Sequence, residues 1–221
     1  MERIILARRK LSEDSLILQT LNPAGLIEKY KIPGILKSKK RNSFFMTPAT
    51  LWDFTIAGNP REIMTPKEYT LITAPYTTDV SYHELEMLSE LIKPLLVMGV
   101  LSYPPESFLL LKKTLQAWKK LETPERELQL NRYYLDFLDL LGLLHYSESC
   151  IECQAVLRRD SLYLLAAGSL CSRCAGSLQY SKAESLPQEW VQDSLQGKAS
   201  HPESMAQPRR EKMLQFLKTM T

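Results

Sequence analysis

Four cysteines, all between residues 150 and 174, constrain this chain more than any other feature. They form two C-x-x-C pairs that are separated by 17 residues. Two residues between paired thiols let both sulfur atoms face one ion, and four thiolates suit tetrahedral Zn²⁺. This separation belongs to the spacing class that indicates a zinc site. The sequence therefore predicts one structural zinc ion, held by Cys150, Cys153, Cys171 and Cys174.

Two other chemistries are open to the same cysteines. Two disulfides are disfavoured because no secretion signal is recognisable and the cytosol keeps thiols reduced. A redox C-x-x-C of the thioredoxin type needs a helix N-terminus within a βαβ unit, a context that neither pair has. Structural zinc is therefore favoured, and a site closed by four protein ligands leaves no position for water or substrate.

Catalytic and membrane-spanning signals are absent from the sequence. It contains no G-x-x-x-x-G-K-[ST] loop, no G-x-G-x-x-G and no H-E-x-x-H, and its three histidines, His83, His145 and His201, lie far apart. His145 precedes Cys150 by five residues, and a helix end is its favoured place rather than the metal. No run of about 18 apolar residues exists. A non-enzymatic, cytoplasmic protein without a membrane partner is the expectation.

Residues 1–75 predict five short strands, at 3–8, 15–21, 26–32, 50–56 and 69–73. Asn22, Pro23 and Gly25 predict a turn after the second strand, and Pro33 with Gly34 predicts a bend after the third. Five strands in about 70 residues fit a small closed or partly open barrel. The OB-fold is the candidate.

From about residue 79 the apolar period becomes helical. Ser81 and Glu84 form a capping box, and Thr123-Pro124-Glu125 predicts the start of a third helix. Three helices with short connections predict an antiparallel helical bundle. Residues 209–217 predict a short amphipathic helix after a polar tract at 181–207 that is expected to be partly mobile linker.

The fold class is therefore α+β, with four segments. They are an OB-fold β-barrel for nucleic-acid binding (1–78), a helical domain (79–149), a zinc-ribbon-like insert (150–178) and a partly mobile C-terminal tail that packs on the helical domain (179–221). Residues 1–70 hold 12 Lys+Arg against 7 Asp+Glu, and the other 151 residues hold 16 against 18. This asymmetry makes the β module basic and the remainder mildly acidic.

Basic side chains along a barrel groove would neutralise phosphates and give salt-sensitive affinity for nucleic acid. Aromatic residues among them, such as Tyr30, Phe44 and Phe45, could stack on bases, although Phe44, Phe45 and Trp52 are better explained as core. A solvated surface with a few extra lysines is the alternative. The candidate DNA-binding residues are Arg8, Arg9, Lys10, Lys29, Lys31, Lys37, Lys39, Lys40 and Arg41.

The order of these parts resembles the RecO family, bacterial mediators of recombination and DNA repair. The likeness covers most of residues 1–178. It is carried by a basic pair before an S-E-x-S-type turn (6–9 and 12–18), the basic loop (36–41), the strand at 46–52, the helix at 131–143 and the two cysteine pairs with Gly168 and Ser169. Family members often have Gly directly after the second cysteine, where this chain has Gln154.

The resemblance implies binding of single- and double-stranded DNA, annealing of complementary strands, and help in loading RecA recombinase on DNA coated by single-strand-binding protein. It implies RecR as a partner, RecA as an indirect one, and the acidic C-terminal tail of single-strand-binding protein as a ligand of the helical part. Candidate residues for that tail are Lys112, Lys113, Lys119 and Lys120.

Three alternatives stay open. A zinc-stabilised adaptor between proteins would show no salt-dependent DNA binding. An RNA-binding OB protein would prefer structured RNA. A thiol oxidoreductase, the least favoured, would need a reducible disulfide with dithiol turnover.

Overall fold

The computed structural model describes residues 1–37, 46–56, 62–76, 80–158, 161–165, 167–177, 185–198 and 206–220. The chain has a mixed α+β fold and divides into two compact units, Met1–Leu121 and Glu122–Thr221. This division separates the three predicted bundle helices, because two belong to the first unit and one to the second. No helix in the described ranges has both the length and the apolar character needed to cross a membrane.

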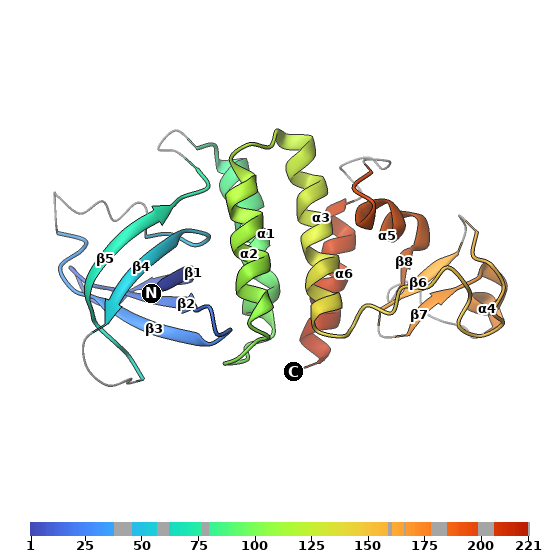
Figure 1. Cartoon of the computed structure of the whole chain (residues 1–221), viewed down its shortest axis with the longest axis horizontal. Helices are drawn as coiled ribbons and strands as arrows, with labels where there is room; N and C mark the ends of the chain where they lie inside the picture. The colour runs from blue at the N-terminus through green and yellow to red at the C-terminus, as the bar shows by residue number, and fades with distance from the viewer. Residues whose placement is uncertain are drawn as a thin grey trace. The chain divides into compact units, whose positions relative to one another are not determined.

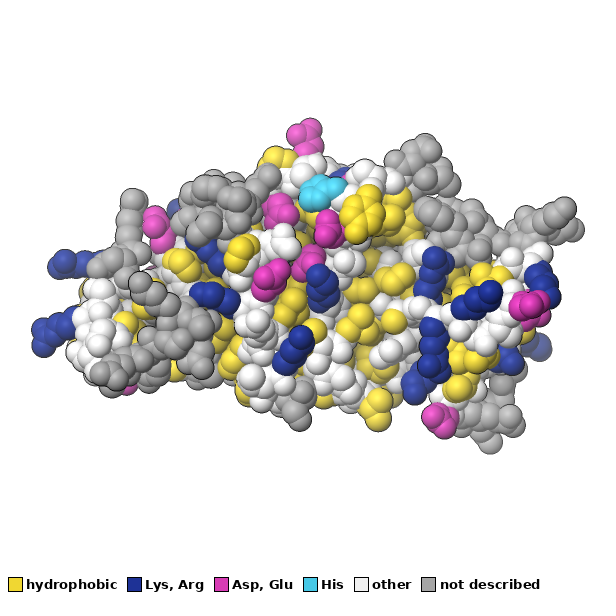
Figure 2. Space-filling view, turned by 180° about the vertical axis from the view of Figure 1, so that it is seen from behind, with side chains coloured by type: hydrophobic (Ala, Val, Ile, Leu, Met, Phe, Trp, Pro, Cys, Tyr) yellow, Lys and Arg dark blue, Asp and Glu magenta, His cyan; other side chains and the backbone are white. Residues whose placement is uncertain are grey.

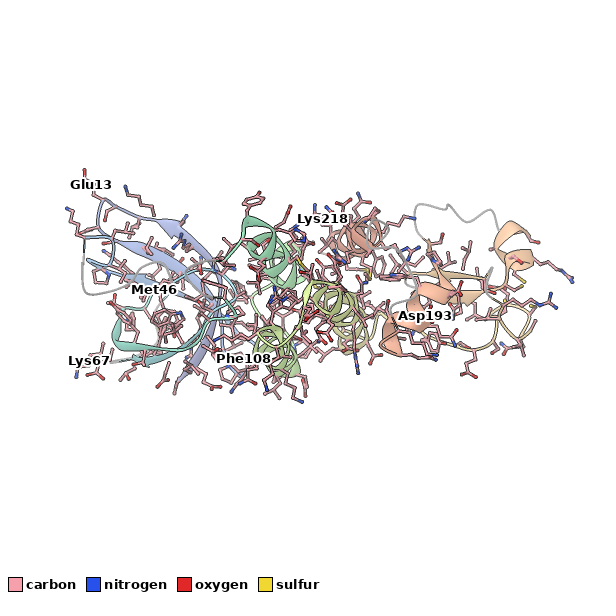
Figure 3. The ribbon with its side chains drawn as sticks, turned by 90° about the horizontal axis from the view of Figure 1, so that it is seen from above. Glu13, Met46, Lys67, Phe108, Asp193 and Lys218 are labelled. Carbon is pink, nitrogen blue, oxygen red and sulfur yellow. The ribbon has the colours of Figure 1, made fainter. Side chains whose placement is uncertain are left out.

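The first unit contains a five-stranded antiparallel sheet in the order β3-β2-β1-β4-β5. All five predicted strands are confirmed, with boundaries shifted by up to three residues. The strands are β1 (Glu2–Lys10), β2 (Leu16–Leu21), β3 (Ile27–Ile32), β4 (Leu51–Ile56) and β5 (Pro66–Thr73). Figures 1 and 3 show that the sheet curls strongly, so that β4 and β5 face β2 and β3 with Met46 between them.

The two outer strands approach each other, but the sheet does not close. A single parallel bridge pairs Tyr30 of β3 with Met64, just before β5. Here the Lys31 N–H donates to the Met64 carbonyl at 2.8 Å, and the Met64 N–H donates to the Lys29 carbonyl at 3.0 Å. The next donor of a parallel ladder would be the N–H of residue 66, which is a proline and has none. The predicted OB-fold barrel is therefore not confirmed.

The concave side of the sheet holds an apolar core. Its buried members come from four strands and the segments between them: Ile5, Leu16, Leu18, Tyr30, Ile32, Ile35, Met46, Trp52, Phe54 and Met64. At one end of this core Arg3, only 3% exposed, pairs with Glu28 at 2.5 Å and donates to the Tyr30 hydroxyl at 3.1 Å. The Tyr30 hydroxyl in turn donates to Glu28 at 2.9 Å. Each polar group of this buried network therefore has a partner, as burial requires.

Helices α1 (Tyr82–Val97) and α2 (Glu106–Trp118) complete the first unit. The predicted capping box is confirmed, since the Ser81 hydroxyl accepts from the Glu84 N–H and the Glu84 carboxylate accepts from the Ser81 N–H. On α2, Lys112 pairs with Glu2 of β1 at 2.6 Å and so ties this helix to the sheet.

The second unit is built on α3 (Thr123–Leu140), which contacts α5 (Gln188–Leu195) and α6 (Ala206–Thr219). Arg210 of α6, 3% exposed, donates to Glu127 and to Asn131 of α3, both at 2.7 Å. The predicted C-terminal helix is thus confirmed and longer than expected. Helix α5 lies inside the tract expected to be partly mobile linker, and it forms because Trp190 and Val191 give it a buried face.

A second, small antiparallel sheet lies around the cysteines, in the order β7-β6-β8. Its strands are β6 (Leu162–Leu164), β7 (Gly168–Leu170) and β8 (Ser185–Pro187), and the short helix α4 (Ser172–Ser177) follows β7. Strands β6 and β7 pair as an antiparallel hairpin with a short turn, and this hairpin lies between the two cysteine pairs. Gly168, with φ +105°, supplies the unusual backbone conformation at that turn.

Candidate metal centre

The four predicted ligands come together at one point. The Sγ atoms of Cys150, Cys153, Cys171 and Cys174 all lie within 4.8 Å of one another, and this cluster can hold a metal ion. All four are free thiols, and Cys153 and Cys171 have their sulfur atoms 3.8 Å apart, far beyond the roughly 2.05 Å of a disulfide.

The sulfur separations fit a tetrahedral ion. Metal–sulfur bonds of about 2.3 Å at tetrahedral angles require neighbouring sulfur atoms to be about 3.8 Å apart. The distance between Cys153 and Cys171 has this value, and the widest separation in the cluster exceeds it by only about 1 Å. A small contraction of the thiols would therefore complete the coordination of one ion, with no place left for a further ligand.

The first cysteine pair lies in a tight, hydrogen-bonded loop. The Cys150 N–H donates to the Ala155 carbonyl at 2.8 Å, and the Gln154 N–H donates back to the Cys150 carbonyl at 2.9 Å. Closing this loop puts Gln154 in the left-handed region, at φ +60°. This is the position at which RecO-like chains often have Gly, and the geometry gives the reason, because glycine adopts positive φ without steric cost.

The second pair is held by β7 and α4. Cys171 directly follows β7, and Cys174 lies in α4, where its N–H donates to the Cys171 sulfur at 3.4 Å. The two halves of the site are joined by the Ile151 N–H, which donates to the Ser169 carbonyl at 3.0 Å. A Cβ at Gly168 would lie 2.8 Å from the His145 carbonyl oxygen, so this close approach admits only glycine.

The thiols differ in their readiness to ionise. Burial of Cys150 acts to raise its pKa, but the backbone N–H groups of Cys153, Cys171 and Glu152 outweigh burial and lower that pKa to about 6. Hydrogen bonds to the sulfur atoms of Cys171 and Cys153, together with burial, raise the pKa of Cys174 to about 12. The loop therefore favours the thiolate form of Cys150, and a bound cation would favour ionisation of the remaining thiols.

Only a small core supports this site. Cys150 is fully buried with Leu164, Leu170 and Ala175, whereas Cys153 is exposed. His145 is not part of the sulfur cluster, and it does not lie at a helix end as favoured from the sequence: α3 ends at Leu140, and His145 is exposed in the segment that follows, where its backbone N–H donates to the Tyr163 hydroxyl at 2.9 Å.

The sheet register divides the predicted DNA-binding residues between two faces. Arg9 of β1 and Lys31 of β3 both lie opposite Ile17 of β2, the strand between them. Lys29 lies opposite Gln19, two residues further along the same face. We call this side of the sheet the outer basic face (Arg9, Lys29, Lys31). Arg8 and Lys10 point to the concave side, where the Arg8 guanidinium contacts the Met46 carbonyl at 3.5 Å. Figure 2 shows Lys and Arg side chains gathered over the sheet, at the right of the view.

The remaining candidates are placed as follows. Lys37 is exposed and 3.7 Å from Glu13, which is exposed as well. Lys39, Lys40, Arg41, Phe44 and Phe45 lie outside the described residues. Of the helical candidates, Lys112 is paired with Glu2, whereas Lys113, Lys119 and Lys120 are exposed. The suggestion that Tyr30 stacks on bases is wrong, because its ring is fully buried in the core, and Trp52 is a core residue as predicted.

Sequence reasoning missed which basic residues share a face of the sheet. Arg8, Arg9 and Lys10 read as one cluster along the chain, yet alternation in a strand sends their side chains to opposite faces. The pairing of Lys29 and Lys31 with Arg9 depends on register, although the period of two was visible in the sequence. Comparison with known proteins does not assign a function to these residues, because no family model matches the chain and no curated protein resembles it significantly.

Proposed function

We propose that this protein is a DNA-binding recombination mediator of the RecO type, whose four cysteines hold a structural zinc ion. It would anneal complementary strands and help load RecA recombinase on single-stranded DNA coated by single-strand-binding protein. The proposal rests on the resemblance of residues 1–178 together with one geometric observation, the outer basic face.

The outer basic face carries the proposal because three cations lie together without counter-charges. Arg9, Lys29 and Lys31 are all exposed, and none of their side chains has a hydrogen bond or ion pair with any described residue. Unpaired surface cations within one or two strand spacings of each other are suited to a phosphate backbone, whose binding releases condensed counterions. A solvated surface tends instead to intersperse charges of both signs.

Two features of the fold agree with this function. The strand order and the bridge between Tyr30 and Met64 are what an OB-fold barrel would have if its last ladder formed, and such barrels bind single strands. Four thiolates without an open position suit Zn²⁺ in a structural role. The ion would therefore cross-link residues 150–174 and take no part in a reaction, in a protein that is not an enzyme.

The proposed partners follow from the resemblance to the RecO family. They are single- and double-stranded DNA, RecR, and the acidic tail of single-strand-binding protein, with RecA affected indirectly. Lys113 on α2 and Lys119 and Lys120 directly after it are exposed and would be available to an acidic tail. A bacterial cytoplasm with access to the nucleoid is the matching location.

The test is annealing of complementary DNA strands by the purified full chain, with and without single-strand-binding protein, over a salt titration. We expect annealing that persists on coated strands and weakens as salt rises. A structured RNA is added as competitor in a parallel series.

Absence of both annealing and salt-dependent DNA binding would overturn the proposal and favour a zinc-stabilised adaptor. Displacement of DNA by the RNA at much lower concentration than by unlabelled DNA would favour the RNA-binding alternative instead.

A further inference from the structure

The aromatic side chains of the large sheet all lie on the side opposite the outer basic face. The five strands contain four aromatic residues, Tyr30, Trp52, Phe54 and Tyr69. Tyr30 and Phe54 are fully buried, Trp52 is 6% exposed, and Tyr69 packs against the same core. Their rings also contact one another edge to face, Tyr30 with Phe54 at 4.8 Å and Trp52 with Tyr69 at 6.1 Å.

The outer basic face offers phosphate ligands but no stacking platform. Register puts Ala7, Gln19 and Lys29 in one row of this face, and Arg9, Ile17 and Lys31 in the next. Gln19 is half-buried and Ile17 is 5% exposed, so charged heads dominate what a ligand would meet. Proteins that hold single strands by their bases use exposed rings, and the described strands present none on this side.

We infer that the outer basic face binds single-stranded nucleic acid by its phosphates alone and leaves the bases turned away from the protein, free to pair. This inference rests on the proposed function and specifies how the strand is held. A strand bound this way keeps its Watson–Crick edges in solvent, so a second strand can pair with it without first displacing protein contacts. Binding is then independent of base identity and falls steeply with salt.

The experiment compares three probes of equal length on the full chain: oligothymidylate, oligodeoxyadenylate and an oligomer of abasic sites. We expect dissociation constants that agree within about threefold, because every stacked base would add about fivefold or more to affinity. Permanganate oxidation of the thymines in the bound strand is measured alongside, and we expect the same reactivity as in the free strand.

Variants locate the effect. Combined Arg9→Ala, Lys29→Ala and Lys31→Ala should reduce the slope of log affinity against log salt by about 2, as loss of three phosphate contacts on a single strand requires. The matched control combines Lys67→Ala, Lys198→Ala and Lys218→Ala, which removes the same charge from three other exposed sites and should leave the slope nearly unchanged.

The outcomes separate this inference from the proposed function. If the protein binds no DNA in a salt-dependent way, the proposed function itself fails. If it binds DNA but the abasic oligomer binds far more weakly, or the thymines are protected, stacking occurs and the inference is wrong. Equal slopes for the two triple variants would likewise refute it, while DNA binding as such would stand.

Discussion

The two sheets of this protein reach stability by different means. The five-stranded sheet of the first unit has strands of six to nine residues and covers a core with rings from Tyr30, Trp52 and Phe54. The three-stranded sheet at the cysteines has strands of three residues, and the buried cluster on its cysteine side comprises, among the described residues, Cys150, Leu164, Leu170 and Ala175, with Tyr163 and Leu186 as the other large buried side chains of the sheet. Hydrophobic burial scales with apolar area, so the second sheet gains far less from it.

The difference indicates what a metal contributes to such a fold. Small modules that cannot bury enough apolar surface are commonly stabilised by metals or disulfides. In this chain the cluster of free thiols adjoins this small buried cluster, which includes Cys150 itself. We therefore expect the large sheet to fold without metal and the cysteine segment to depend on it.

Replacing a metal ligand should have the largest effect. Cys150→Ser removes the buried sulfur, and zinc release should unfold residues 145–177 because binding and folding of structural zinc sites are coupled, with apparent binding energies of about 10–16 kcal/mol. Zinc content by mass spectrometry and amide hydrogen exchange measure the result. Protection should be lost in that segment and retained in β1–β5.

Ser172→Ala is the matched control, because Ser172 is exposed between the second pair of ligands. It should keep one zinc ion per chain. Loss of protection in the large sheet of Cys150→Ser would break the comparison, and an unchanged zinc content would refute the assignment of the ligands.

The large sheet has its own vulnerable point in the buried ion pair. Arg3→Met leaves the Glu28 carboxylate without its cation, and the free energy of unfolding should fall by about 3–5 kcal/mol. Adding Glu28→Gln should restore much of this loss, because the isolated charge is then gone. Urea unfolding followed by tryptophan fluorescence tests both variants, and zinc content should stay at the native value in each. Equal loss in the single and double variants would show that charge isolation is not the cause.

A backbone change at Gly168 should affect only the cysteine sheet. Gly168→Ala forces a Cβ to within 2.8 Å of the His145 carbonyl oxygen at φ +105°, which should cost about 2 kcal/mol or more and weaken zinc binding. Gly176→Ala, with no atom near its added Cβ, is the control and should be neutral or stabilising. Zinc affinity by chelator competition distinguishes them, and similar affinities for the two would contradict the close approach.

Most of the elements could be predicted from the sequence because their signals are local. The five strands followed from β-branched and alternating residues between turns, and the start of α1 from Ser81 and Glu84. The ligand set followed from spacing alone, because two C-x-x-C pairs can meet at one ion with little dependence on the rest of the fold.

What could not be predicted depends on long-range geometry. The incomplete closure of the sheet follows from a proline at the position that should supply the next ladder donor, and this is visible only once Tyr30 pairs with Met64. Helix α5 was hidden in a polar tract because a buried face made of Trp190 and Val191 is too short to give a clear period. The outer basic face needed the register that brings Arg9 to Lys31.

The smallest expected effect tests the loop of the first cysteine pair. Gln154 adopts φ +60°, a conformation that costs an L-residue roughly 1–2 kcal/mol and glycine almost nothing. Gln154→Gly should therefore tighten zinc binding by about fivefold, or about 1 kcal/mol, after allowance for the greater freedom of glycine in the unfolded chain. Competition with a chromogenic chelator measures this shift.

The control is Gln192→Gly within α5, which should lower stability by about 1 kcal/mol without changing zinc affinity, because a glycine there weakens a helix instead of relieving a strained turn. Weaker zinc binding by Gln154→Gly would mean that the Gln154 side chain, whose amide donates to the Ile151 carbonyl at 3.4 Å, stabilises the loop more than its backbone strains it.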